Sequence, residues 1–191
     1  MVSVNQVQQF LSENRRSIMQ PVLEIRPERP VDIEAVRELN QEAFNQGPEA
    51  GIVDRLRENC PDIVSLVAVD GGEIIGHVLF SPVTIDGSET ATGMGLAPMS
   101  VLPDRQRQGV GSFLIEAGLD ILRSRKCPFV IVLGHAEYYP RFGFEPASKC
   151  GLTSQWDGIP DEAFMAILLD EDTMAGVQGI ARYRSEFDEA M

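Results

Sequence analysis

One stretch of eleven residues limits how this chain can fold more than any other. An apolar segment, residues 96–101, runs into it. The stretch itself reads Val101-Leu102-Pro103-Asp104-Arg105-Gln106-Arg107-Gln108-Gly109-Val110-Gly111. The pattern after it is typical of an amphipathic helix, because apolar side chains recur at spacings of three and four residues: Val110, Phe113, Leu114, Ala117 and Ile121. The stretch therefore predicts a strand, a short loop and a helix N-terminus, in that order.

A helix that begins at this loop suits an anionic ligand. The first N–H groups of a helix are unpaired and carry partial positive charge. Gly109 and Gly111 let a ligand approach that backbone closely, while Arg105 and Arg107 add charge at the rim. These features favour a phosphate or pyrophosphate. The dinucleotide fingerprint needs a third glycine and the P-loop needs a lysine, so both are excluded. The alternative is a tight strand-to-helix turn that uses glycines for geometry alone.

Two motifs in order carry a family resemblance. The segment Gln106 to Gly111 fits [QR]-x-x-G-x-[GA] and resembles the pyrophosphate loop of the GNAT N-acetyltransferases, which bind acetyl-coenzyme A. Tyr-x-x-x-Gly-Phe begins at Tyr139, after the apolar strand expected at 129–133, where the GNAT pattern places it. The resemblance covers roughly residues 22–146. Residues 133–144 and the tail from Phe164 to Tyr183 are similar, more narrowly, to the YhbS-like group of predicted acetyltransferases.

The resemblance implies a fold and a reaction. The fold is an α/β (α+β) domain of GNAT type, with a mixed, mostly antiparallel central sheet of about seven strands and helices on both faces. The reaction is direct transfer of an acetyl group from acetyl-CoA to an amine, with Tyr139 as the general acid that protonates the departing thiolate. A phenol has a pKa near that of a thiol, which suits this task. An ordinary packing role is the alternative for Tyr139.

The resemblance also assigns the cofactor contacts. In the family, the backbone of the strand before the loop pairs with the pantetheine arm, and a backbone N–H holds the thioester oxygen. The expected cofactor-binding residues are Met99, Ser100, Val101, Gln106, Arg107, Gln108, Gly109, Val110, Gly111 and Ser112. Met99 and Val101 are also suited to an ordinary core position.

One departure from the family concerns the general base. Many members carry a glutamate near this strand, whereas residues 96–101 here contain no carboxylate. Glu42, Glu73, His77 and His135 are candidates elsewhere, but each suits a surface or structural role, and no base is assigned. A metal site is not expected, since the two histidines and three cysteines form no Cys/His cluster.

Composition narrows the partners. The formal net charge is −13, with two lysines among 16 basic residues, so nucleic acid and anionic membrane surfaces are not expected as partners. Three cysteines without a C-x-x-C motif suit a reducing cytoplasm. Neither a signal peptide nor a membrane span is expected. Homodimers are common in the family, so a homodimer is possible.

The chain length of 191 residues suits one domain. We expect a short amphipathic helix in an N-terminal extension, residues 1–20, and a single GNAT domain over residues 21–191. The expected helices cover about 32–44, with Asp32 as the cap, 51–58 and 110–126, with one or two helical turns at 136–141. The expected strands cover about 22–26, 65–69, 73–82, 91–101, 129–133, 163–169 and 177–183, with a further strand entered at Phe142–Phe144. Bulges are expected near Gly93, Gly95 and Pro98.

Three functions fit these features. The first is an acetyl-CoA-dependent N-acetyltransferase acting on a small-molecule or protein amine. The second is an acyl-CoA-binding sensor without turnover, which the missing carboxylate favours. The third is a toxin-like acetyltransferase of charged tRNA, which the negative charge disfavours.

Overall fold

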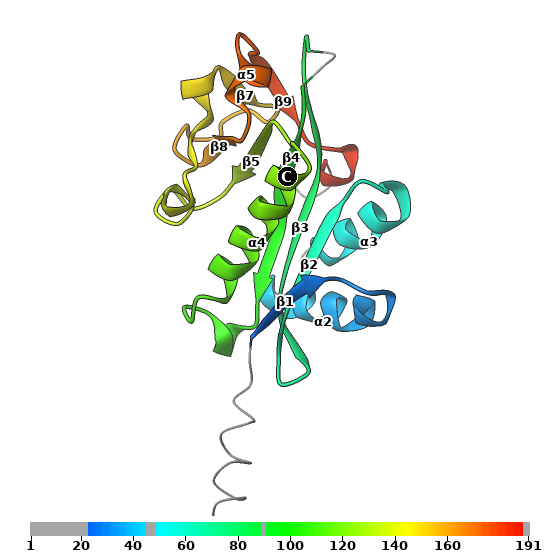
Figure 1. Cartoon of the computed structure of the whole chain (residues 1–191). Coiled ribbons are helices and arrows are strands. Elements are labelled where there is room, and N and C mark those ends of the chain that lie inside the picture. The colour runs from blue at the N-terminus through cyan, green and yellow to red at the C-terminus, as the bar shows by residue number, and fades with distance from the viewer. Residues whose placement is uncertain (1–22, 45–48, 89–90, 189–191) are drawn as a thin grey trace, which may run out of the picture.

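The computed structural model describes residues 23–44, 49–88 and 91–188 (Figure 1). The helix expected within residues 1–20 lies outside the described residues. In the described ranges, no helix is both long and apolar enough to cross a bilayer.

Nine strands of the described chain form one sheet, with the order β1-β2-β3-β4-β5-β8-β6 along its main path and β9 pairing with both β3 and β7. Neighbours are antiparallel except for the pairs β4–β5 and β7–β9. This is the mixed, mostly antiparallel sheet that the sequence predicts. The strands are β1 (Glu24–Pro27), β2 (Val64–Asp70), β3 (Glu73–Ile85), β4 (Thr92–Val101), β5 (Phe129–Leu133), β6 (Glu145–Pro146), β7 (Leu152–Ser154), β8 (Phe164–Leu168) and β9 (Gly179–Arg182).

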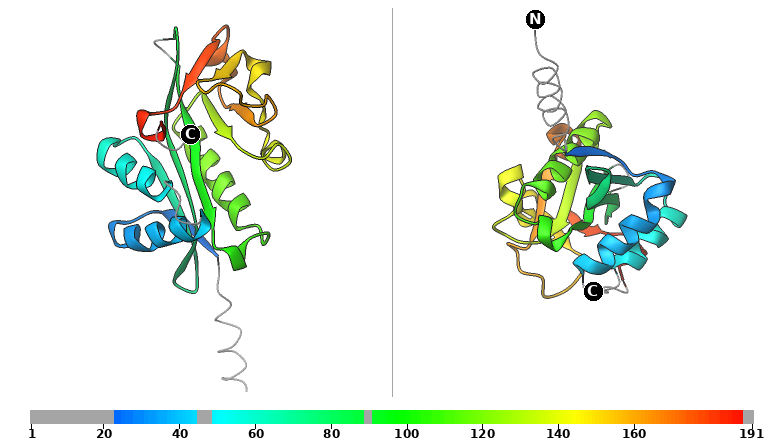
Figure 2. Two further views of the ribbon diagram at one scale, coloured as in Figure 1. Left: turned by 180° about the vertical axis from the view of Figure 1, so that it is seen from behind. Right: turned by 90° about the horizontal axis from the view of Figure 1, so that it is seen from below.

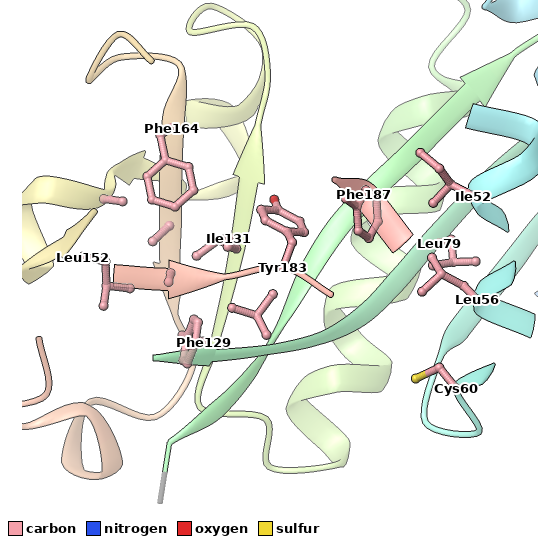
Figure 3. Packing of buried hydrophobic residues seen from close by; sticks show 14 of the residues in the cluster. Ile52, Leu56, Cys60, Leu79, Phe129, Ile131, Leu152, Phe164, Tyr183 and Phe187 are labelled. Carbon is pink, nitrogen blue, oxygen red and sulfur yellow. The ribbon is translucent and has the colours of Figure 1, made fainter. Parts of the chain in front are cut away.

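Helices cover both faces of the sheet (Figure 2). The helices α2 (Ile33–Ala43) and α3 (Glu49–Asn59) lie on one face, and α4 (Val110–Ser124) lies on the other. A four-residue helix, α5 (Glu171–Met174), precedes β9. Each face has its own apolar cluster, because alternate residues of a strand point to opposite sides. Leu79 belongs to the cluster under α3, while its neighbours Val78 and Phe80 belong to the cluster under α4. Figure 3 shows the first of these clusters, including Leu56 of α3 beside Leu79.

The cap expected at the start of α2 is wrong in its details. Asp32 precedes the helix but makes no side-chain bond to its N–H groups. Its carboxylate instead accepts hydrogen bonds of 2.6 and 2.9 Å from Arg26, and one of 2.7 Å from the Arg29 N–H group. The carboxylate therefore closes the preceding 3-10 turn, Pro30–Asp32, and fastens it to β1. The Arg26 guanidinium, followed by the Arg29 N–H, holds the pKa of this carboxyl below its usual range.

The parallel pair β4–β5 positions the functional site. Its ladder has three rungs, and the last joins Leu96 to Val132. Beyond that rung β4 continues to Val101, whereas β5 ends at Leu133, so the strands part and leave a gap between them. The register between β3 and β4 shifts at the same level, between Val78 and Phe80, which confirms the irregularity expected near Pro98. The bulges expected near Gly93 and Gly95 are wrong, because both residues pair with β3 in regular register. We call this opening the β4–β5 gap, and its closed end is the Leu96–Val132 rung.

Candidate functional site

A cleft of about 730 Å³ runs along the β4–β5 gap. It is bounded by the end of β4, the loop that follows, the first turn of α4 and the segment after β5. The residues that line it are Met99, Val101, Arg105, Gln106, Arg107, Gly109, Val110, Gly111, Ser112, His135, Glu137, Tyr138, Tyr139 and Arg141. The structure thus brings the two sequence motifs to opposite sides of one cleft.

The N-terminus of α4 opens directly into this cleft. Gly109 occupies the cap position with φ of 89°, a left-handed conformation that favours glycine, and no side chain caps the helix. The first helical bond runs from the Phe113 N–H to the Gly109 carbonyl, at 3.1 Å. The N–H groups of Val110, Gly111 and Ser112 therefore have no partner within the helix. Together with the helix dipole they form a site suited to phosphate oxygens.

Two glutamine side chains form hydrogen bonds to the loop backbone and not to a ligand. Gln106 donates from Nε2 to the Val101 carbonyl at 3.1 Å, and Gln108 donates from Nε2 to the Asp104 carbonyl at 2.8 Å. Gln106 still lines the cleft, but Gln108 does not. The loop is thus held in shape by side-chain bonds to its own backbone, which presents the helix N-terminus at low entropic cost.

The cations of the loop divide into one that is paired and one that is free. Arg105 is held by Asp70 on β2, with 2.8 Å between Nη1 and Oδ2. Arg107, at φ of 60°, is exposed and forms no ion pair with any described residue. On the opposite wall Arg141 lies 4.0 Å above the centre of the Tyr138 ring. Sequence reasoning overlooked Arg141, although it is the one cation between the end of β5 and Phe144.

Ser100 is the second expected contact that lies outside the cleft lining. Side chains alternate along β4, so Met99 and Val101 face α4 whereas Ser100 faces α2. Ser100 is buried opposite His77 of β3, and its hydroxyl has no hydrogen-bond partner among the described residues. Any contact of Ser100 with a ligand in the cleft is therefore through its backbone.

Tyr139 is buried in the cleft wall. Its ring meets Tyr138 and Phe144 edge-on, with centroids 5.2 and 5.7 Å away. Gly134 allows the ring to lie against the backbone, because a Cβ atom there would overlap ring carbon Cε2. Burial, with a smaller effect of Tyr138, raises the pKa of the hydroxyl well above its ordinary value. In the free protein the pKa of Tyr139 is therefore not near that of a thiol, contrary to the expectation from the sequence. The hydroxyl keeps its proton at neutral pH.

Tyr138 joins the two motifs physically. Its hydroxyl oxygen would lie 2.7 Å from a Cβ atom at Gly111, so a larger residue there would push the two walls apart. The second glycine of the loop is therefore required by a contact between protein segments, in addition to any ligand.

The four candidates for a general base are scattered. Glu42 and Glu73 line a separate cavity of about 610 Å³ beside α2. His77 is fully buried, 3.3 Å from the Asn40 amide and 2.9 Å from the Ser65 hydroxyl. Burial and Arg57 lower the pKa of His77 to about 3, so it is neutral. Only His135 lines the cleft, where Glu137, overlooked in the sequence, is the one carboxylate of the lining.

Comparisons with known proteins agree with this geometry. Residues 24–147 match the model of the acetyltransferase (GNAT) domain family. The uncharacterized N-acetyltransferase YhbS of Escherichia coli K12 is 36% identical over 165 residues, which span 86% of this chain and 98% of that protein.

Two solved structures share the fold over nearly the whole chain. The crystal structure of YhbS from Escherichia coli in complex with CoA has a TM-score of 0.83 at 34% identity, covering 89% of this chain and 94% of that one. A GNAT family acetyltransferase from Brucella melitensis in complex with acetyl-CoA has a TM-score of 0.72 at 36% identity, covering 88% and 100%.

Proposed function

This chain belongs to the GNAT acetyltransferase family, and on that premise we propose that it transfers the acetyl group of acetyl-CoA to an amine, with Tyr139 as the general acid. The observation that supports this most is the single cleft that joins a helix N-terminus, the free edge of β4 and the Tyr139 ring. The acceptor is an amine of a small molecule or of a protein. Residues 21–191 act as one catalytic domain in this proposal.

Each part of the cleft suits one part of acetyl-CoA. The N–H groups of Val110, Gly111 and Ser112 bind pyrophosphate oxygens, and Arg107 supplies the opposite charge at the rim. Beyond the Leu96–Val132 rung, the side of β4 that faces away from β3 has no strand partner, and at Met99 to Val101 it forms hydrogen bonds with the pantetheine arm, as a neighbouring strand would. The thioester then lies at the closed end of the gap, because the arm extends from the α4 N-terminus towards that end.

The reaction requires one bond to form and one to break. The nitrogen lone pair of the neutral amine forms the C–N bond to the thioester carbon, and the C–S bond breaks with its electrons going to sulfur. Tyr139 donates its proton to that sulfur, so coenzyme A leaves as a thiol, and the proton that the nitrogen loses passes to solvent water and returns to Tyr139. Burial keeps the Tyr139 proton in place until the thiolate develops.

Calorimetric titration with acetyl-CoA tests the cofactor site. Ser112→Asp places a carboxylate in the first turn of α4, where it suits the helix dipole but repels pyrophosphate. Ser112→Ala is the matched control without charge. We expect micromolar binding by the parent and by Ser112→Ala, and a loss of at least tenfold in Ser112→Asp.

An amine panel then tests turnover, with release of the coenzyme A thiol as the signal. The panel contains a polyamine, an aminoglycoside, an amino sugar and peptides with free lysine and N-terminal amines. No binding by the parent contradicts the proposed cofactor. Binding without turnover of any amine supports the alternative of a non-catalytic acyl-CoA-binding protein.

A further inference from the structure

Tyr183 is a buried residue that belongs to neither of the two sequence motifs. It follows β9 directly and belongs to the apolar cluster on the α2–α3 face. Trp156 stacks on its ring at 5.3 Å, Phe187 meets it edge-on at 5.2 Å, and its N–H donates to Gln155 Oε1 at 2.6 Å. The ring is therefore fixed from several sides (Figure 3).

This ring spans the two strands that border the gap. It lies against Gly95 of β4, where a Cβ atom would overlap ring carbon Cε1. Its hydroxyl reaches the backbone of Leu133, one residue beyond the last β4–β5 rung. In Figure 3 the ring lies between Ile131 of β5 and Phe187. The Tyr183 hydroxyl therefore lies at the level of the closed end of the β4–β5 gap, behind β4 and β5 rather than among the residues that line the cleft.

The hydroxyl has no hydrogen-bond partner among the described residues, although it is buried. Buried polar groups are normally paired, because an unpaired one loses its bonds to water without replacement. The Leu133 N–H does not supply the missing partner. The Gly134 N–H donates to the carbonyl of Ala163, the residue before β8, so the N–H of Leu133 points to the other side of β5, towards β4 at the last rung of the ladder. An N–H group can only donate, and the phenol proton still lacks an acceptor.

We propose that Tyr183 is a second hydroxyl of the reacting centre, and that it donates a hydrogen bond to the thioester oxygen of acetyl-CoA. This inference rests on the proposed function. Tyr139 and Tyr183 belong to clusters on opposite faces of the sheet, so their hydroxyls approach the thioester from different sides. In this proposal Tyr139 donates to the sulfur and Tyr183 donates to the oxygen. As the amine attacks, charge grows on that oxygen, and a fixed donor stabilises it. Tyr183 keeps its proton throughout, so the balance of the transfer is unchanged.

Burial suits Tyr183 to donate rather than to ionise. Desolvation, with a smaller effect of Tyr139, raises the pKa of the Tyr183 hydroxyl far above its ordinary value. A phenol in this state is a neutral donor at any physiological pH. The one titratable group that adds to this shift in pKa is Tyr139, whose own hydroxyl also keeps its proton.

Infrared spectroscopy of bound acetyl-CoA tests the hydrogen bond without an acceptor amine. With a ¹³C label at the thioester carbonyl, its stretching band is separated from the protein bands, and a hydrogen bond to the oxygen lowers its frequency. Tyr183→Phe removes only the hydroxyl, so we expect the band to move to higher frequency while acetyl-CoA affinity stays within about threefold. Because the lost hydroxyl had no protein partner, the variant folds as stably as the parent. With an accepted amine, kcat falls roughly 10- to 1000-fold while KM for acetyl-CoA is retained.

Ser81→Ala is the matched control. It removes another buried hydroxyl that has no described partner, on β3 opposite Gly95, and β3 does not border the β4–β5 gap. Its band stays at the parent position. An unmoved band in Tyr183→Phe overturns the assignment of Tyr183 and leaves the proposed function intact. Failure of the parent to bind acetyl-CoA overturns both.

Discussion

The Tyr139 ring lies directly against the backbone of Gly134, with no room between them for even a methyl group. Gly134 follows the last residue of β5, and Tyr139 begins the 3-10 turn Tyr139–Phe142. Through this contact the end of β5 sets the position of the hydroxyl that we assign as general acid. Because Gly134 has no side chain, the Tyr139 ring can lie against the end of β5, and this sets the distance of its hydroxyl from the β4–β5 gap.

Gly134→Ala is expected to lower activity without removing the cofactor. The φ angle of Gly134 is not in the left-handed region, so alanine fits the backbone and the only severe overlap is with the Tyr139 ring. Displacing an acid by about 1 Å reduces turnover roughly 100-fold. Steady-state kinetics measures kcat, and calorimetry measures the dissociation constant for acetyl-CoA, which is expected to stay within a few-fold of that of the parent. If Gly134→Ala adds a full further loss to Tyr139→Phe, the glycine acts in some other way than through the tyrosine.

Tyr139→Phe and Tyr138→Phe separate the two hydroxyls of the cleft. Loss of a general acid reduces kcat by about 10²- to 10⁴-fold, so we expect that range for Tyr139→Phe, with acetyl-CoA affinity retained. Tyr138→Phe is expected to have the smaller effect, because its hydroxyl packs against Gly111 at the phosphate end. The measurement is kcat and KM for both substrates. A larger loss in Tyr138→Phe transfers the acid assignment to that residue.

The sequence predicted the parts of the site that are built by consecutive residues. The loop to Gly111 and the helix after it are local features, set by glycine geometry and apolar spacing, and the structure contains them. The family and the mixed sheet are confirmed as well. The strand expected to begin after Phe144 is present as the two-residue β6, whereas the three-residue β7 was missed because so few residues carry no periodic pattern.

Features that depend on distant residues could not be predicted in this way. Ser100 and Gln108 belong to the right segments, but the alternation of β4 turns Ser100 to the other face, and Gln108 bonds to its own loop. Tyr183 lies against Gly95, 88 positions earlier, and only the order of strands in the sheet brings them together. Nothing near Tyr183 in the sequence marks this proximity.

Gly118→Ala is expected to destabilise the fold while leaving the cofactor site intact. A Cβ atom at this position in α4 would overlap the ring of Phe80, which is fully buried in the sheet. Alanine gains about 1 kcal/mol of helix propensity, whereas overpacking a core destabilises by about 1–3 kcal/mol. We therefore expect Gly118→Ala to unfold at a lower urea concentration than the parent. Glu116→Ala, on the exposed side of the same helix, is the control and is expected to change stability by about 0.5 kcal/mol or less.

Stability is expected to fall between pH 6.5 and 5 because of His77. Burial, then Arg57, lower its pKa to about 3, whereas a histidine in the unfolded chain titrates near 6.5. Between these values the unfolded state binds the extra proton, so the stabilisation present above pH 6.5 is lost as the pH falls. One group contributes about 1.4 kcal/mol per pH unit, or roughly 2 kcal/mol by pH 5. The carboxyls with lowered pKa values, such as Asp32 and Glu186, act mainly at lower pH, since unfolded carboxyls titrate near 4.

The two histidines of the chain offer a matched comparison for this effect. His77→Gln removes the titrating ring and is expected to flatten the dependence of the free energy of unfolding on pH in this window, although the variant is less stable because the ring packs against Asn40 and Ser65. His135 is exposed at the cleft, so His135→Gln retains the slope of the parent. Urea unfolding at half-unit steps from pH 7 to 5 measures both slopes. Equal slopes in the parent and His77→Gln would show that His77 takes up its proton in the folded protein as readily as in the unfolded chain, which contradicts the prediction.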